Sequence, residues 1–145
     1  MINTDAQRLE HSLWECKYHI VFIPKYRKKS LFGQIRKDLG RIMKELARQK
    51  KCEIIEGKVM PDHIHMLISI PPKYPVSNII GYIKGKSAIY IARYYRGKKK
   101  NFAGERFWAR GYFVSTVGRD EEVIKTYIRE QEKADKDSEQ IPLFR

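Results

Sequence analysis

The sequence has few features that would place it outside the cell or in a membrane. Its two cysteines, Cys16 and Cys52, fit neither the spacing of a metal site nor a catalytic context, and we expect both to be small buried hydrophobic residues. The first ten residues are polar and lack the apolar core of a signal peptide. No apolar run approaches the length that spans a membrane. These absences predict a cytoplasmic protein.

Acidic residues are also scarce. There are 17 Asp and Glu against 30 Lys and Arg, which gives a net charge of +13. A charge of this size acts on association rather than on the fold, and nucleic acid is the first polyanion to expect as a partner. A membrane surface comes second, but no helix combines a basic face with a bulky apolar one. Without repeats or low-complexity segments, the length predicts one domain over residues 1–145, with a flexible charged tail at residues 136–145.

The longest alternating apolar run, residues 59–70, predicts a central strand with two histidines on one face. Successive side chains of a strand point to opposite faces, so Ile64, Met66, Ile68 and Ile70 would face a core. His63 and His65 then lie side by side on the other face, at the spacing of a two-histidine metal site. A bare His-x-His pattern is more often accidental. Here the flanking apolar residues and the Pro61-Asp62 turn fix the register of the pair.

The remaining periodicity predicts a β-α-β-β-α-β order followed by one more helix. The expected elements are a strand at residues 14–24, a helix at 33–50, strands at 52–60 and 63–70 that form a hairpin across the Pro61-Asp62 turn, a helix capped by Ser77 that runs to about 96, a strand at 107–117 and a helix at about 121–135. This order is the split βαβ, ferredoxin-like pattern of α+β proteins. We therefore expect an antiparallel sheet with two helices on one face, and the histidines on the open face.

Several basic residues are candidates for phosphate contacts, although a solvated surface explains them equally simply. They are the cations Lys25, Arg27, Lys28 and Lys29 around Tyr26 after the first strand, with Tyr26 itself, and Lys84, Lys86 and Arg93 on the second helix. Gly81 and Gly85 in that helix each cost about 1 kcal/mol relative to alanine, which predicts close packing against the sheet or a nucleic acid backbone. His19 falls on the less apolar face of the first strand, where it could be a neighbour of the histidine pair, although a surface histidine is the simpler interpretation.

The last predicted helix offers Tyr127 and Gln131, four residues apart and so on one helical face. Either residue alone fits the edge of an amphipathic helix. A glutamine in the middle of the apolar stripe is harder to explain by packing. A tyrosine hydroxyl is a competent nucleophile, and an amide oxygen can complete the coordination of a hard cation.

Taken together, these residues resemble a known family. His63-Ile64-His65 is similar to the His-hydrophobic-His (HUH) signature of single-strand DNA endonucleases. Over nearly its full length the chain resembles the small single-tyrosine HUH transposases of the simplest bacterial insertion sequences. The matching stretches are Tyr18-His19-Ile20-Val21-Phe22, Lys25-Tyr26-Arg27, Met60-Pro61-Asp62-His63-Ile64-His65-Met66-Leu67, Gly81-Tyr82-Ile83-Lys84-Gly85-Lys86-Ser87, Phe107-Trp108-Ala109-Arg110-Gly111-Tyr112 and Tyr127-Ile128-Arg129-Glu130-Gln131.

The resemblance implies a specific activity. His63, His65 and Gln131 would hold one Mg²⁺ or Mn²⁺ per active site, and the last helix would be the catalytic one. Tyr127 would attack a phosphate of single-stranded DNA, leaving a 5′-phosphotyrosine and a free 3′-OH. The family's partners would be single-stranded DNA with subterminal hairpins and a second copy of the chain, in a homodimer whose active sites are shared.

Two other classes remain open. A histidine-triad or zinc hydrolase would need a further alternate histidine or another ligand, and position 67 is Leu. A non-catalytic single-stranded nucleic-acid-binding module of the same ferredoxin-like fold would place aromatic residues on the open sheet face, where this sequence places histidines.

Overall fold

The computed structural model describes residues 7–9, 12–25, 31, 33–95, 107–118 and 133. Contacts divide the chain into two compact units, Cys16–Val117 and a second that combines Met1–Glu15 with Gly118–Arg145. In the second unit, β1 (Gln7–Leu9) and β2 (Ser12–Trp14) pair as an antiparallel hairpin. The predicted last helix and the flexible tail lie outside the described residues, apart from Lys133, which is helical. The single domain over residues 1–145 stays a prediction.

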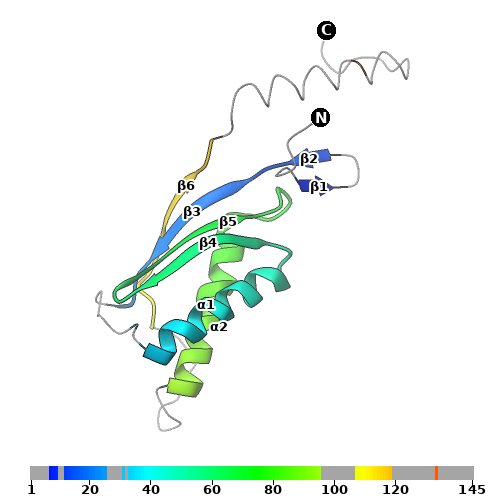
Figure 1. The fold of residues 1–145 in the computed structure, drawn as a ribbon. Coiled ribbons are helices and arrows are strands. Elements are labelled where there is room, and N and C mark those ends of the chain that lie inside the picture. Colours follow the sequence, from blue (N-terminus) through cyan, green and yellow to red (C-terminus); the bar gives the residue numbers. More distant parts are fainter. Residues whose placement is uncertain are drawn as a thin grey trace. The chain divides into compact units, whose positions relative to one another are not determined.

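The larger unit is a four-stranded antiparallel sheet with two helices on one face (Figure 1). Its elements follow the chain as β3 (Lys17–Phe22), α1 (Gly33–Gln49), β4 (Glu53–Met60), β5 (His63–Ser69), α2 (Val76–Tyr95) and β6 (Phe113–Thr116). The order in the sheet is β4-β5-β3-β6, and each neighbouring pair is antiparallel. The predicted α+β, ferredoxin-like fold is confirmed.

Alternation along β3 and β5 builds the core between the sheet and the helices. Ile20, Phe22, Ile64, Met66 and Ile68 are almost completely buried. They pack with the buried stripes of the two helices, which include Leu39, Met43, Leu46, Ile80, Ile83 and Ile91. Burying one such side chain stabilises the fold by about 1.5–3 kcal/mol. This core holds every second residue of both strands on the helix side and leaves the residues between them on the open face.

Two strand boundaries differ from the predictions because tertiary pairing interrupts the sequence pattern. The expected strand at 14–24 is shorter, since Trp14 pairs with Gln7 in the separate hairpin. The expected strand at 107–117 is broken. Trp108 forms an isolated bridge with Pro24, and β6 begins only at Phe113, after Gly111 adopts a left-handed φ of 75°. An L side chain disfavours that conformation, which suits glycine at the break.

The predicted cap at Ser77 is wrong. The helix α2 already begins at Val76, so Ser77 lies within its first turn. The carbonyl of Pro75 accepts hydrogen bonds from the backbone N–H groups of Asn78 and Ile79, at 3.1 and 3.4 Å. Proline before the helix thus supplies the first acceptor.

Trp108 locks the segment before β6 into the core. Its ring meets those of Phe22 and Phe107 edge to face, with centroids 4.8 and 4.7 Å apart. Its Nε1 atom donates to Ser87 Oγ at 3.0 Å, and that hydroxyl donates to the Lys84 carbonyl at 3.1 Å. The indole N–H and the serine hydroxyl are both buried, so removing either one would leave the other with an unsatisfied hydrogen-bonding position.

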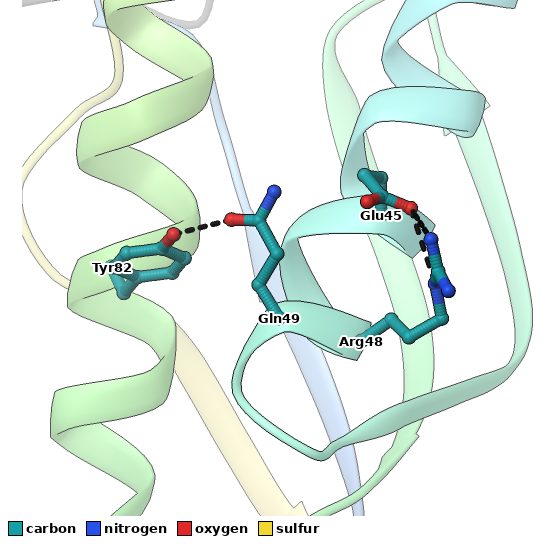
Figure 2. A network of polar contacts seen from close by, with 4 residues as sticks. All are labelled: Glu45, Arg48, Gln49 and Tyr82. Carbon is teal, nitrogen blue, oxygen red and sulfur yellow. Dashed lines mark hydrogen bonds and ion pairs between the residues drawn. The ribbon is translucent and has the colours of Figure 1, made fainter.

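Polar contacts fix α1 against α2. The Tyr82 hydroxyl of α2 donates to Gln49 Oε1 at the end of α1, close to the exposed Glu45–Arg48 pair within α1 (Figure 2). The Tyr95 hydroxyl donates to the Asp38 carboxylate, a bond that lowers the pKa of Asp38 and raises the pKa of Tyr95 to about 12. The Glu45–Arg48 pair contributes little to stability because both groups are solvated.

The close packing against the sheet predicted for Gly81 and Gly85 is not observed, and close approach of a nucleic acid backbone stays a prediction. A Cβ atom added at either position would meet no atom of the described residues within 4 Å. The cysteines are both free thiols. Cys52 is buried, and burial raises its pKa to about 11, whereas Cys16 is only partly buried. Among the described residues, no helix combines the length and apolar character needed to cross a membrane.

Candidate active site

The strand β5 presents both predicted metal-ligand histidines on the open face of the sheet. Ile64 and Met66, on either side of His65, are buried against the helices, so His63 and His65 must point the other way. His63 is half-buried and His65 is exposed. Lys58 of β4 and Val21 of β3 lie directly opposite His65 on the two neighbouring strands. The pair thus sits in the interior of the sheet.

A carboxylate orients the first histidine. Asp62 Oδ1 lies 2.9 Å from His63 Nδ1. Metal-binding histidines usually have such a partner on the second ring nitrogen, because it fixes the tautomer and leaves Nε2 as the ligand atom. In the sequence, Asp62 was predicted only as a turn residue. A carboxylate directly before a candidate ligand, in a two-residue turn, is the pattern that indicates its role.

A third histidine lies beside the pair. The rings of His19 and His65 are stacked, with centroids 5.6 Å apart and planes 24° apart. His19 is partly buried, and its Nδ1 atom has no hydrogen-bond partner among the described residues. Of the two interpretations of His19, the neighbour of the histidine pair is therefore confirmed and the ordinary surface histidine is wrong, because the diagonal pairing of β3 with β5 brings it against His65.

The two histidines do not complete a metal site by themselves. In the part of the chain that the structure describes, no cluster of three or more His, Cys, Asp or Glu side chains is arranged to hold a metal ion. Two imidazoles aligned on one face, one of them with a carboxylate behind it, fit an ion that takes further ligands from elsewhere. The other predicted residues, Tyr127 and Gln131, lie outside the described residues.

The predicted phosphate contacts on the second helix are not gathered at the histidines. Lys84, Lys86 and Arg93 belong to α2, on the covered side of the sheet. The Lys84 ammonium donates to the carbonyls of Ala109 and Gly111 at 2.8 and 2.7 Å, and partial burial lowers its pKa. Two of its three donors are therefore used within the protein, whereas Lys86 and Arg93 are exposed.

Lys25 is half-buried after β3, and its backbone N–H bonds to the Phe107 carbonyl at 2.7 Å. The remaining residues predicted to contact phosphate, Tyr26, Arg27, Lys28 and Lys29, lie outside the described residues.

Comparison with known proteins gives consistent sequence matches. The sequence model of the family described as "Transposase IS200 like" matches residues 12–131. The chain is 42% identical over 139 residues to the transposase for insertion sequence element IS200 of Salmonella typhimurium, covering 96% of this chain and 91% of that protein. It is 31% identical over 120 residues to the ISDra2 transposase TnpA of Deinococcus radiodurans, covering 82% and 86% of the two chains.

Solved structures agree with the sequence matches. A crystal structure of a transposase from Deinococcus radiodurans superimposes with a TM-score of 0.69 at 26% identity, covering 86% of this chain and 97% of that one. The REP-associated tyrosine transposase bound to a REP hairpin has the same fold, with a TM-score of 0.54 at 16% identity over 86% and 66% of the two chains. With its ferredoxin-like sheet and a family match that covers most of its length, this chain belongs to the IS200-like transposase family.

Proposed function

We propose that this transposase cleaves and rejoins single-stranded DNA at insertion-sequence ends through a 5′-phosphotyrosine, and that it depends on Mg²⁺ or Mn²⁺. The observation that carries the proposal is the pair His63 and His65, aligned on the open face with Asp62 at hydrogen-bonding distance from His63. Family membership supports DNA cleavage and strand transfer. The divalent ion, the single tyrosine and the roles of Tyr127 and Gln131 are parts of the proposal.

In the proposed reaction the Tyr127 hydroxyl loses its proton and attacks the scissile phosphorus. A phosphorus–oxygen bond forms to the tyrosine as the bond to the 3′-oxygen breaks, and that oxygen takes up a proton to become a 3′-OH. His63, His65 and the Gln131 amide oxygen would hold the ion, with Asp62 fixing the His63 ring. A bound divalent cation would supply a Lewis acid for the phosphate oxygens.

Rejoining follows from the chemistry of the tyrosine ester. The link keeps the energy of the original phosphodiester, so no nucleotide cofactor is needed. A tyrosine hydroxyl has a pKa near 10 in model compounds, which makes phenolate a good leaving group when a 3′-OH attacks the link. One residue can therefore serve both cleavage and strand transfer.

A non-catalytic single-strand-binding module is the second candidate. Phe113 of β6 supports it, because this side chain is 59% exposed on the same face as the histidines. Binding modules of this topology stack bases on such aromatics. The interior of the open face, however, carries His19, His63 and His65 rather than aromatic platforms, which favours the catalytic proposal.

The partners in this proposal are DNA with subterminal hairpins and a second copy of the chain. A homodimer with shared sites would combine the histidines of one chain with Tyr127 and Gln131 of the other. Exchange of one element between protomers is a low-cost route to a symmetric dimer. The net charge of +13 supports binding to DNA before any cleavage takes place.

The test is a covalent-adduct assay with single-stranded DNA from the ends of the chain's own element. Wild-type protein with Mn²⁺ should give a protein–DNA adduct that survives denaturation, and chelator should abolish it. Tyr127→Phe should fold and bind DNA but form no adduct, since only the hydroxyl is lost. Tyr82→Phe, which removes a tyrosine hydroxyl from the helix layer, is the matched control and should keep the adduct.

Two outcomes would contradict the proposal. An adduct that persists in Tyr127→Phe would assign the nucleophile to another residue. Cleavage that is unchanged in chelator would remove the requirement for a divalent cation.

A further inference from the structure

A basic groove lies between α1 and the outer strand β4, and its lining includes none of the residues predicted to bind DNA. Its volume is about 1090 Å³, and it is open to solvent. Five of its ten lining residues are cations: Arg36, Lys37, Arg41 and Lys44 of α1, and Lys58 of β4. None of the described residues that line it is acidic. A solvated helix face also carries cations, usually alternating with carboxylates; the two carboxylates of α1, Asp38 and Glu45, do not line the groove.

The geometry of α1 explains why the charges converge. Residues three or four apart lie on the same face of a helix, and Lys37, Arg41 and Lys44 follow this spacing. Of the cations that line the groove, only Arg41 has an ion pair among the described residues, with Asp38 at 3.5 Å. Gly40 lies between them, and a Cβ atom there would meet nothing within 4 Å among the described residues. The groove wall is therefore both cationic and open to close approach.

The groove reaches the histidines at one point on β4. Gly57 and Lys58 line the groove, and they also line a hollow of about 160 Å³ beside His65 and His19 on the open face. Lys58 lies directly opposite His65 in the sheet register. The register between β4 and β5 shifts between Ile54 and Glu56, just before this point, and such irregularities at sheet edges often redirect side chains next to active sites.

We propose that this groove binds the phosphate backbone of the unpaired DNA strand that leads to the scissile phosphate. The strand would lie along Arg36, Lys37 and Lys44 and cross the edge of the sheet at Gly57 and Lys58 to reach His65. This assignment rests on the proposed function, because it takes the histidines as the place of cleavage. It adds the route by which the substrate arrives, from the helix layer to the open face.

The route selects a single strand over a duplex. Duplex DNA is stiff, with a persistence length of about 150 base pairs. The free energy of bending it around one β-strand would therefore far exceed the binding free energy that the local contacts supply. A single strand bends freely and interacts with cationic grooves through its phosphates. The change of face at Gly57 and Lys58 is therefore compatible only with unpaired DNA.

The test compares two triple variants of the full chain with the same net charge. Arg36→Gln/Lys37→Gln/Lys44→Gln neutralises the groove, and Lys50→Gln/Lys51→Gln/Lys73→Gln neutralises exposed or half-exposed cations that do not line it. Binding of a fluorescent oligothymidylate is measured by anisotropy in chelator, across a range of salt concentrations. The groove triple should bind about tenfold more weakly and lower the salt slope by about 2, since each single-strand phosphate contact contributes about 0.7.

Two further measurements test whether the strand passes Lys58 and whether the groove prefers unpaired DNA. Adding Lys58→Gln to the groove triple should lower the slope by about 0.7 more. A blunt, fully paired DNA hairpin should bind both triples equally. The inference is overturned if the control triple loses as much oligothymidylate binding as the groove triple, because net charge alone would then explain the effect. It is also overturned if the groove triple weakens hairpin binding and spares the single strand.

Failure of this inference can be told apart from failure of the proposed function. Binding in chelator needs no cleavage, and adduct formation by the wild-type chain needs no groove variant. An active wild-type chain with a normally binding groove triple would remove only the groove. An inactive wild-type chain with a weakly binding groove triple would leave the groove as a binding site and remove the cleavage chemistry. Circular dichroism of each variant checks that the fold is intact.

Discussion

His63 Nδ1 and Asp62 Oδ1 lie 2.9 Å apart, so the last residue of the β4–β5 turn holds the first histidine of β5 in one orientation. Asp62→Ala should therefore weaken Mn²⁺ binding by about 10- to 100-fold, the usual cost of removing the partner of a metal-binding histidine. Isothermal titration of the full chain with Mn²⁺ measures this effect. Asp62→Asn, which keeps an acceptor oxygen but loses the charge, should fall between Asp62→Ala and wild type.

Glu53→Gln is the matched control for Asp62, because it removes an exposed carboxylate at the start of β4. It should leave Mn²⁺ affinity unchanged. Equal affinities of Asp62→Ala and wild type would show that the carboxylate does not orient a metal ligand.

The stacking of His19 on His65 gives a second prediction. Aromatic stacking contributes about 0.5–1.5 kcal/mol, so losing it in His19→Ala should weaken Mn²⁺ binding by about two- to tenfold, through a less ordered His65 ring. His19→Phe keeps a flat ring and should restore the affinity. If His19→Phe binds Mn²⁺ as weakly as His19→Ala, the imidazole nitrogen itself is required, and His19 is not merely a positioning residue.

Shared active sites can be tested with mixed dimers. Tyr127→Phe and His65→Ala chains should each be inactive alone. If sites are shared, a heterodimer contains one site with intact histidines from the first chain and an intact tyrosine from the second, and cleavage returns. Differently tagged chains allow the heterodimer to be purified before the adduct assay. A purified heterodimer that stays inactive would mean that each chain builds its own site.

The exposed glycines of α2 make a stability prediction. A Cβ atom at Gly81 or Gly85 meets nothing within 4 Å among the described residues, so replacement by alanine should stabilise the protein by about 1 kcal/mol at each position. Urea unfolding measures the change. Gly111→Ala is the contrasting control, and it should destabilise the protein because Gly111 has a φ of 75°.

The glycine variants also report on function. If Gly81→Ala raises stability but lowers cleavage, this face of α2 is approached closely by DNA or by a second chain. A loss of stability in Gly81→Ala would mean that the face is packed in the folded protein.

The periodicity of apolar residues predicted the strands and helices that bury one face in the core. The strand β5 was predicted with its histidines on the open side because Ile64, Met66 and Ile68 alternate without interruption. The first strand was predicted too long, since Trp14 continues the same alternation although it pairs elsewhere. Phe107 and Trp108 were predicted to lie in a strand. A pattern of apolar residues, however, does not distinguish residues that pair with a neighbouring strand from residues whose side chains only pack into the core.

From the sequence, only the relations between site residues on the same strand could be predicted. His63 and His65 are two residues apart, so one strand determines their relation. The stacking of His19 on His65 depends on the register between β3 and β5, and the groove of Arg36, Lys37 and Lys58 depends on how α1 packs beside β4. Lys84 was assigned to DNA by its charge, whereas its two carbonyl partners come from a segment 25 and 27 residues further along the chain.

The position of β5 inside the sheet determines how firmly its two histidines are held in place before a ligand binds. Both of its edges are hydrogen-bonded, to β4 and to β3, so its amide hydrogens exchange with solvent only when the sheet itself opens. His63 and His65 are thus carried by one of the last segments to open. In the proposed reaction, an arriving DNA strand would meet imidazoles that are already preorganised, and little of the binding free energy would be spent on aligning them.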